Sequence, residues 1–230
     1  LRIDGQHAGM HGALRERREV FLVCYVHPVF LTLCFSVHVV PCHHSKRSER
    51  EPVKLLVINN LSSGFGEGAV YDFVRSFMQD GDEACLRSTD GTTGVSTLLD
   101  DAASFDAVIA SGGDGTVATV SYMLADSGIP VLPFPAGTAN LLALNLASPM
   151  ETHALAKMVR EGRTLDFDLG EIEVEDRKFG FGIMAGAGYD AAIMHGAEAG
   201  KRLFGPMAYL SAAIANTMPQ KSHFILNLDG

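Results

Sequence analysis

The stretch Ile109-Ala-Ser-Gly-Gly-Asp-Gly-Thr-Val117 places three glycines around an aspartate, directly after a run of apolar residues. Glycines let the backbone turn through conformations that side chains forbid, and they let another molecule approach the main-chain amides closely. Residues 106–110 before the glycines are apolar except for Asp106, which is typical of a buried strand, and the residues after the glycines keep helical spacing. We therefore predict a strand, a ligand-binding turn and a helix.

The order of strand, loop and helix repeats on both sides of this stretch. Strands are expected at residues 53–59, 83–86, 106–110 and 129–134, and helices at 67–80, 95–103, 117–127 and between residue 140 and Pro149. Alternation of strands and helices is typical of a parallel sheet covered on both faces. The sequence predicts a Rossmann-like α/β nucleotide-binding domain.

Composition limits what the glycine turn can bind. The chain has 230 residues, 47% of them hydrophobic, so it is long enough to bury a core. With 18 Lys and Arg against 27 Asp and Glu, it carries no broad basic surface, and we expect no nucleic-acid partner. A polyphosphate is still compatible with an acidic protein, because backbone amides and hydroxyls can bind it without positive side chains.

The chain changes character near Pro52. Residues 1–50 carry a net charge of +3 against −12 for the rest, and three of the four cysteines lie there. We expect residues 1–51 to be an extension outside the folded unit, followed by the nucleotide-binding domain at 52–163. The alternative is a membrane anchor at residues 20–40, an apolar run interrupted by His27-Pro28.

Beyond residue 163 the pattern changes from helical spacing to alternation. Apolar residues alternate on both sides of a polar turn at residues 175–177, which predicts an antiparallel hairpin with one buried face. Residues 164–230 are therefore expected to form an incomplete, β-rich second domain.

Three loops that follow strands are rich in Gly, Ser, Thr or Asn, at residues 59–66, 111–116 and 135–140. Ligands of parallel sheets bind at the carboxyl ends of the strands, so these loops are expected to form one site. The stretch Gly64-Phe-Gly-Glu-Gly-Ala69 matches the dinucleotide fingerprint G-x-G-x-x-A, which leaves a dinucleotide as an alternative ligand. No G-x-x-x-x-G-K-[ST] sequence occurs, which excludes an ordinary P-loop kinase.

Two motifs together resemble a known family. Gly112-Gly-Asp-Gly-Thr116, followed by Pro135-Ala-Gly-Thr-Ala-Asn140, is similar to the diacylglycerol kinase catalytic domain family, which includes bacterial lipid kinases and sphingosine kinases. Asn59-Asn-Leu-Ser-Ser63 resembles the family's N-P-x-S-G opening, with Asn60 in place of Pro and Ser63 in place of Gly.

Two further segments resemble parts of the same family downstream of the nucleotide domain. Asp168-Leu-Gly170 resembles its D-x-G segment, and Gly186-Ala-Gly-Tyr-Asp190 its G-x-G-x-D segment. The family's second domain is a β-sandwich, and the resemblance implies the start of one here.

The resemblance also implies roles for individual residues. Those implied to bind ATP are Asn59, Ser62, Ser63, Thr89, Gly112, Gly113, Asp114, Gly115, Thr116, Thr138 and Asn140. Asp114 is the implied catalytic residue and Mg²⁺ ligand, with Asp168 and Asp190 in support. Alternatives from the residues themselves are a helix cap for Asp114 and a purely local turn for Asn140.

The function implied is ATP- and Mg²⁺-dependent phosphorylation of a lipid hydroxyl, as in diacylglycerol, within phospholipid biosynthesis. The partners implied are a lipid at a cytoplasmic membrane surface and, in a homodimer, a second copy of the chain. Relatives supply the general base late in their second domain, so we expect it beyond Gly230, and we expect the 230 residues to bind nucleotide without turning over lipid. The alternatives are an NAD kinase-like or dinucleotide-binding enzyme, and a nucleotide-binding module without activity.

Overall fold

The structure is a computed structural model. It describes residues 2–3, 21–27, 30–36, 51–63, 67–90, 94–162, 164–174, 177–188 and 227–228. The chain divides into two compact units, one of Val39–Leu169 and one of Leu1–His38 together with Gly170–Gly230. The domain boundaries expected at residues 51 and 163 stay predictions.

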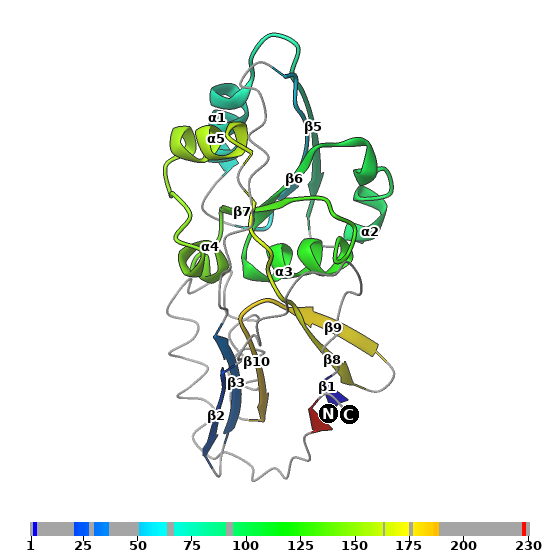
Figure 1. The fold of residues 1–230 in the computed structure, drawn as a ribbon, viewed down its shortest axis with the longest axis vertical. Helices are drawn as coiled ribbons and strands as arrows, with labels where there is room; N and C mark the ends of the chain where they lie inside the picture. The colour runs from blue at the N-terminus through cyan, green and yellow to red at the C-terminus, as the bar shows by residue number, and fades with distance from the viewer. Residues whose placement is uncertain are drawn as a thin grey trace, which may run out of the picture. The chain divides into compact units, whose positions relative to one another are not determined.

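The unit Val39–Leu169 is built on a parallel sheet with the strand order β5-β4-β6-β7 (Figure 1). Its strands are β4 (Lys54–Asn60), β5 (Glu83–Thr89), β6 (Ala107–Gly112) and β7 (Val131–Pro135). All three strand pairs are parallel. The predicted α/β fold with a parallel sheet is confirmed.

Helices lie on both faces of this sheet. They are α1 (Glu67–Phe77), α2 (Val95–Leu98), the 3₁₀ helix η1 (Ala102–Ser104), α3 (Asp114–Met123), α4 (Leu141–Asn145) and α5 (Thr152–Arg160). Figure 1 shows α1 and α5 together on one face, with α3 on the other. Their apolar sides are needed there because both faces of a parallel sheet have to be shielded from water.

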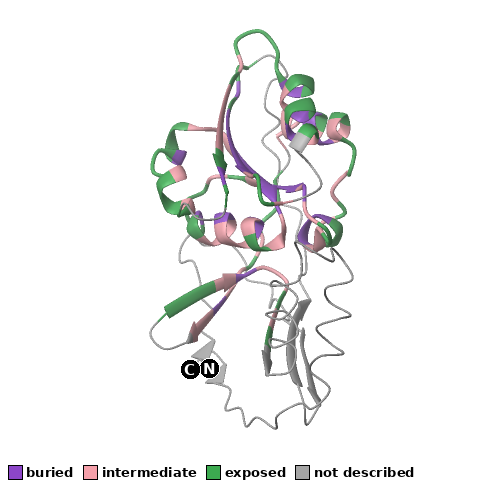
Figure 2. Cartoon of the chain, turned by 180° about the vertical axis from the view of Figure 1, so that it is seen from behind, coloured by how far each residue is buried: buried purple, intermediate pink, exposed green. Residues whose placement is uncertain are grey.

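The core explains why the two central strands are continuous apolar runs. Residues 55–59 of β4 and 108–112 of β6 are all buried, and Figure 2 shows this burial along the middle of the sheet. One face packs against α1 and α5 through the cluster Val53, Leu55, Val57, Val70, Phe73, Phe77, Ile109, Leu132, Phe134, Ala136, Leu155 and Ala156. Strands buried on both faces need apolar residues at successive positions instead of alternation.

The helix predicted at residues 95–103 is wrong in its length, because α2 ends at Leu98. Arg87 on the edge strand β5 donates from Nη1 to the Leu98 carbonyl at 2.8 Å. In a longer α-helix the same carbonyl would also accept the Ala102 amide four residues later. The Ala102 amide instead donates to the Leu99 carbonyl at 3.0 Å, and the chain continues as the 3₁₀ turn η1.

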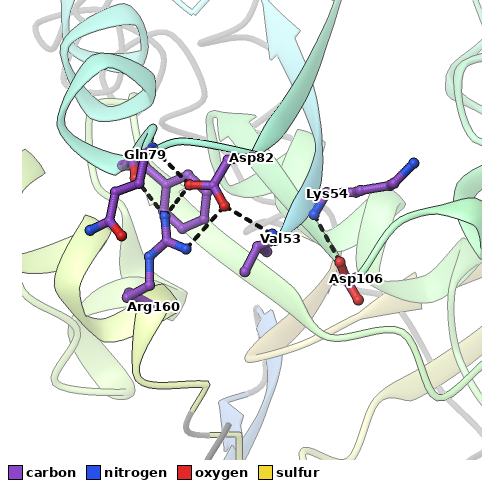
Figure 3. A network of polar contacts seen from close by, with 7 residues as sticks. Val53, Lys54, Gln79, Asp82, Asp106 and Arg160 are labelled. Atoms are coloured by element: carbon purple, nitrogen blue, oxygen red, sulfur yellow. Dashed lines mark hydrogen bonds and ion pairs between the residues drawn. The ribbon is translucent and has the colours of Figure 1, made fainter. Parts of the chain in front are cut away.

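A buried ion pair joins α5 to the start of β5. The guanidinium of Arg160 donates from Nη1 to Asp82 Oδ1 at 3.1 Å, and its Nη2 contacts Asp82 Oδ2. Figure 3 shows the two side chains facing each other, with the Val53 and Gln79 amides donating to the same carboxylate at 2.9 and 2.8 Å. Arg160 also stacks over the Phe77 ring, 4.2 Å from its centroid. This network connects α1, α5, β4 and β5 at the amino end of the sheet.

The other unit contains two sheets in its described parts. One has the order β11-β1-β8-β9 and the other β10-β3-β2. Their strands are β1 (Arg2–Ile3), β2 (Phe21–His27), β3 (Phe30–Ser36), β8 (Gly170–Val174), β9 (Arg177–Phe181), β10 (Met184–Gly188) and β11 (Asn227–Leu228).

The predicted antiparallel hairpin is present as β8 and β9, which pair from Gly170↔Phe181 to Val174↔Arg177. Its apolar face is not buried throughout, because Phe179 is 47% exposed. Among the residues that the structure describes, no helix is long and apolar enough to cross a membrane.

Candidate functional site

The strand order creates a switch point between β4 and β6. The chain leaves β4 for β5 on one side and then passes to β6 on the other side of β4. Loops diverge at such a point, and ligands of open parallel sheets bind in the crevice that they leave. Asn59 and Ser111 are register partners there, and Gly112 lies beside Pro135 on the next strand. The glycine turn therefore starts where a ligand site is expected.

The glycine turn presents the first amides of α3. Gly113 is the residue before the helix; its amide donates to Ser63 Oγ at 3.0 Å, and its carbonyl accepts the Thr116 amide at 2.9 Å. Within the described part of the chain, the amides of Asp114 and Gly115 have no acceptor. A Cβ placed on Gly113 or Gly115 would have no heavy atom within 4 Å. An anion can therefore approach these two amides closely.

The second motif loop packs directly against the glycine turn. A Cβ on Gly137 would lie 2.6 Å from the Gly113 Cα, which is closer than real Cβ atoms come to backbone. Within the turn, a Cβ on Gly112 would lie 2.6 Å from the Thr116 Cβ. Both glycines are thus required by close approach, and the two motifs form one structure.

Asn140 gives the second loop its shape. Its backbone is left-handed, with φ 51° and ψ 42°, a conformation that Asn tolerates better than most residues. Its side-chain amide accepts the Gly137 N–H at 2.8 Å and donates to the Gly137 carbonyl at 2.9 Å. These bonds agree with the local-turn interpretation, and contact with ATP stays a prediction.

Asp114 connects the two motifs through its side chain. It is the first residue of α3, and its Oδ1 accepts the amide of Leu142, in the first turn of α4, at 3.4 Å. Asp114 therefore caps the neighbouring helix α4. The alternative interpretation of the sequence was a cap of its own helix, α3. In the described residues Oδ2 has no hydrogen-bond partner, so it can take a cation.

Asp114 also lines a small hollow between the two motif loops. The other residues of this hollow are Gly112, Val117, Pro133, Phe134, Pro135, Asn140, Leu142 and Ala143. The described parts of the chain contain no group of three or more His, Cys, Asp or Glu side chains that could enclose a metal. A metal held by Asp114 would therefore take its other ligands from a bound molecule and from water.

Asn59 is a buried polar residue at the carboxyl end of β4, 4% exposed. Its Oδ1 accepts the Ser111 hydroxyl at 3.1 Å. Its Nδ2 is buried without a hydrogen-bond partner among the described residues. Buried donors are almost always paired, so a bound ligand or water is the expected acceptor.

The first loop, residues 61–63, is held by main-chain and side-chain bonds. The Thr89 carbonyl, at the end of β5, accepts the Leu61 amide at 2.8 Å. The Ser62 amide donates to Asn60 Oδ1 at 2.9 Å, and the Ser62 hydroxyl donates to the Asp90 carbonyl. Asn60 in turn donates from Nδ2 to Thr116 Oγ1 at 2.8 Å.

Most of the predicted residues converge at this edge of the sheet. Those on β4, β5, β6 and the turns after them are Asn59, Ser62, Ser63, Thr89, Gly112, Gly113, Asp114, Gly115 and Thr116. Thr138 lies exposed in the second loop. Asp168 lies exposed after α5, and Asp190 lies outside the described residues.

Three residues of the site were missed by reasoning from the sequence: Asn60, Ser111 and Gly137. The departure of Asn60 from the family's proline was the available signal for the first. Ser111 and Gly137 lie inside the quoted motifs, but their partners are distant in sequence, so no local pattern identified their contacts.

The sequence of this chain is similar to those of several known proteins. A diacylglycerol kinase of Mycobacterium tuberculosis is 35% identical over 129 residues, which are 54% of this chain and 41% of that protein. A probable YegS-like lipid kinase of Pectobacterium atrosepticum is 32% identical over 130 residues, 54% of this chain and 43% of that protein. An uncharacterised protein of Synechocystis is 32% identical over 115 residues, 50% of this chain and 26% of that protein. The chain spans less than half the length of each of these relatives.

The family model named "Diacylglycerol kinase catalytic domain" matches residues 54–172, which are 119 of the 230 residues. The match includes β4, the glycine turn, the second motif loop and α5. The resemblance drawn from the motifs is confirmed: the chain belongs to the diacylglycerol kinase catalytic domain family.

Proposed function

We propose that this chain binds ATP with Mg²⁺ and is the nucleotide-binding part of a lipid kinase. The kinase transfers the γ-phosphoryl group of ATP to a lipid hydroxyl, as in diacylglycerol. One observation carries the proposal: the two motif loops touch at Gly113 and Gly137, beside the switch point of the sheet. This contact gathers one carboxylate and two amides, which have no acceptor among the residues that the structure describes, at the same edge. Such a set suits a polyphosphate with its cation.

The residues have separate tasks in this proposal. The Asp114 and Gly115 amides donate to phosphate oxygens, and the Asn59 Nδ2 donates to the bound nucleotide or to a water beside it. Asp114 holds Mg²⁺ through one carboxylate oxygen, which fits because Mg²⁺ keeps several waters and is commonly bound by one or two carboxylates and substrate phosphates. When bound, Mg²⁺ offsets the charge that develops on the transferred phosphoryl group.

The substrate and partners are proposed from the family. Relatives named as a diacylglycerol kinase and a probable lipid kinase support a lipid acceptor, and a lipid acceptor implies work at a membrane surface. The acidic composition argues against a nucleic-acid partner. A homodimer stays a prediction.

The proposal is tested with a ligand panel and one substitution. ATP with Mg²⁺ should raise the unfolding temperature more than ADP or NAD does. Asp114→Asn keeps an oxygen for the Leu142 amide but loses the charge, so calorimetry should show ATP affinity that no longer depends on Mg²⁺. The matched control is Asp126→Asn, an exposed aspartate with φ 58° just after the other end of α3, where Asn is equally tolerated.

Three results would contradict the proposal. Preference for NAD over ATP would favour the dinucleotide-binding alternative. Unchanged Mg²⁺ dependence in Asp114→Asn would remove Asp114 from the cation site. ATP binding without phosphate transfer to any lipid by a longer form of the protein would favour the alternative of a nucleotide-binding module.

A further inference from the structure

Two residues of the first loop depart from the N-P-x-S-G pattern, Asn60 and Ser63, and both have side chains that reach the glycine turn. Asn60 stands where the pattern has Pro, and Ser63 where it has Gly. Neither Pro nor Gly has a side-chain hydrogen-bonding group. The contacts of these two side chains with the turn are therefore available only with the residues found in this chain.

Ser63 determines which amide of the turn already has a hydrogen-bond acceptor. Its Oγ accepts the Gly113 amide at 3.0 Å, across 50 positions of sequence. This amide is one of those at the start of α3 that the helix itself cannot satisfy. With Gly113 held by Ser63, the next two amides of the same turn, those of Asp114 and Gly115, have no acceptor among the described residues.

Asn60 holds the other end of the same turn. Its Nδ2 donates to Thr116 Oγ1 at 2.8 Å, and its Oδ1 accepts the Ser62 amide at 2.9 Å. One side chain thus fixes the first loop and the last residue of the glycine turn together. The bond to Thr116 is half-buried and so partly protected from competing water, whereas the bond from the Ser62 amide is exposed.

We infer that Asn60 and Ser63 are positioning residues, which hold the glycine turn from both ends in the shape that presents the Asp114 and Gly115 amides to phosphate. The inference rests on the proposed function for the identity of the ligand. A turn fixed before binding loses less conformational freedom when the ligand arrives, and so binds more tightly.

The test compares Ser63→Ala and Asn60→Ala with Ser127→Ala in the full chain. Ser127 is a matched control because its hydroxyl donates to the Leu124 carbonyl at 2.6 Å and accepts the Ile129 amide at 3.2 Å, beyond the opposite end of α3. Affinity for ATP with Mg²⁺ is measured by calorimetry at a temperature where all variants are folded. The exchange rate of the Gly113 amide is measured by NMR without nucleotide.

Ser63→Ala and Asn60→Ala should each weaken ATP affinity by about 3- to 10-fold, the value of one neutral hydrogen bond, while Ser127→Ala should leave it unchanged. Ser63→Ala should also speed exchange of the Gly113 amide by a similar factor. A purely structural role would lower the unfolding temperature and leave ATP affinity unaltered. If Ser63→Ala does not fold, Ser63→Gly removes the same hydroxyl and carries the same expectation.

The outcomes separate the two proposals. Wild-type protein that binds ATP while both variants keep its affinity would overturn the positioning role and leave the proposed function in place. Wild-type protein that binds no ATP would overturn the proposed function, and the positioning role with it. Unaltered exchange of the Gly113 amide in Ser63→Ala would overturn the Ser63 contact itself.

Discussion

At the scale of single residues, Asp82 is a charged side chain whose protonation is changed by its surroundings. The hydrogen bond from Arg160 lowers the pKa of the Asp82 carboxyl from 3.8 to about 2, although burial acts in the opposite direction. Its side chain is 1% exposed. Because the pKa is lower in the folded protein, this carboxylate stabilises the fold above about pH 4, and the stabilisation is lost as the pH falls toward 2. The expected loss over that range is about 2 kcal/mol.

We predict that Asp82→Asn lowers the free energy of unfolding at pH 7 by about 3 kcal/mol, because it leaves the Arg160 guanidinium without its buried counter-charge. Denaturant unfolding from pH 7 to pH 2 should show a flatter pH dependence for the variant than for wild type. Asp72→Asn is the control, since its pair with Arg75 lies exposed on α1 and should matter little. Equal acid sensitivity of wild type and Asp82→Asn would contradict the role of this pair.

At the scale of elements, the second motif loop lies so close to the glycine turn that each limits the position of the other. We predict that Gly137→Ala lowers the free energy of unfolding by about 1–3 kcal/mol and weakens ATP binding, because the added methyl group would push against the Gly113 backbone. The φ angle of Gly137 is not positive, so the effect is steric. Unfolding followed by circular dichroism measures the change.

The matched control is Gly68→Ala on α1. Gly68 is exposed, and a Cβ there would meet no heavy atom within 4 Å. The same substitution should stabilise the protein by about 0.5–1 kcal/mol, because alanine is the better helix former. If both substitutions shift stability in the same direction, the close contact between the two loops is not what limits residue 137.

At the scale of the whole molecule, the parallel sheet and its core come from one continuous stretch. The residues of the core cluster all lie within the range from Val53 to Ala156. Every strand of the sheet lies within the unit Val39–Leu169. We predict that residues 39–169 expressed alone unfold in one cooperative transition and keep ATP binding with Mg²⁺. Thermal unfolding followed at several wavelengths should give coincident curves. Non-coincident curves, or loss of soluble protein, would show that the other parts of the chain are needed for folding.

The sequence by itself determined most of the elements of this unit and the edge of the sheet at which the candidate site lies. Apolar runs such as residues 54–60, each followed by a loop rich in Gly, Ser or Asn, predicted the strands and the edge at which their loops meet. These features are local, because burial on both faces of a sheet requires continuous apolar residues and tight turns require glycine. The glycine turn and Asp114 could be singled out for the same reason.

Only the tertiary structure decided which side chains meet. The bond from Leu142 to Asp114 joins residues 28 positions apart, and the bond from Ser111 to Asn59 joins residues 52 positions apart. Such contacts depend on the order of the strands in the sheet, which brings together residues that are far apart in the sequence. At the end of α2, the Leu98 carbonyl likewise accepts a donor from another element, the guanidinium of Arg87 on β5. Hydrogen-bonding groups pair with the partners that the folded chain brings near, so their pairing follows from the fold as a whole.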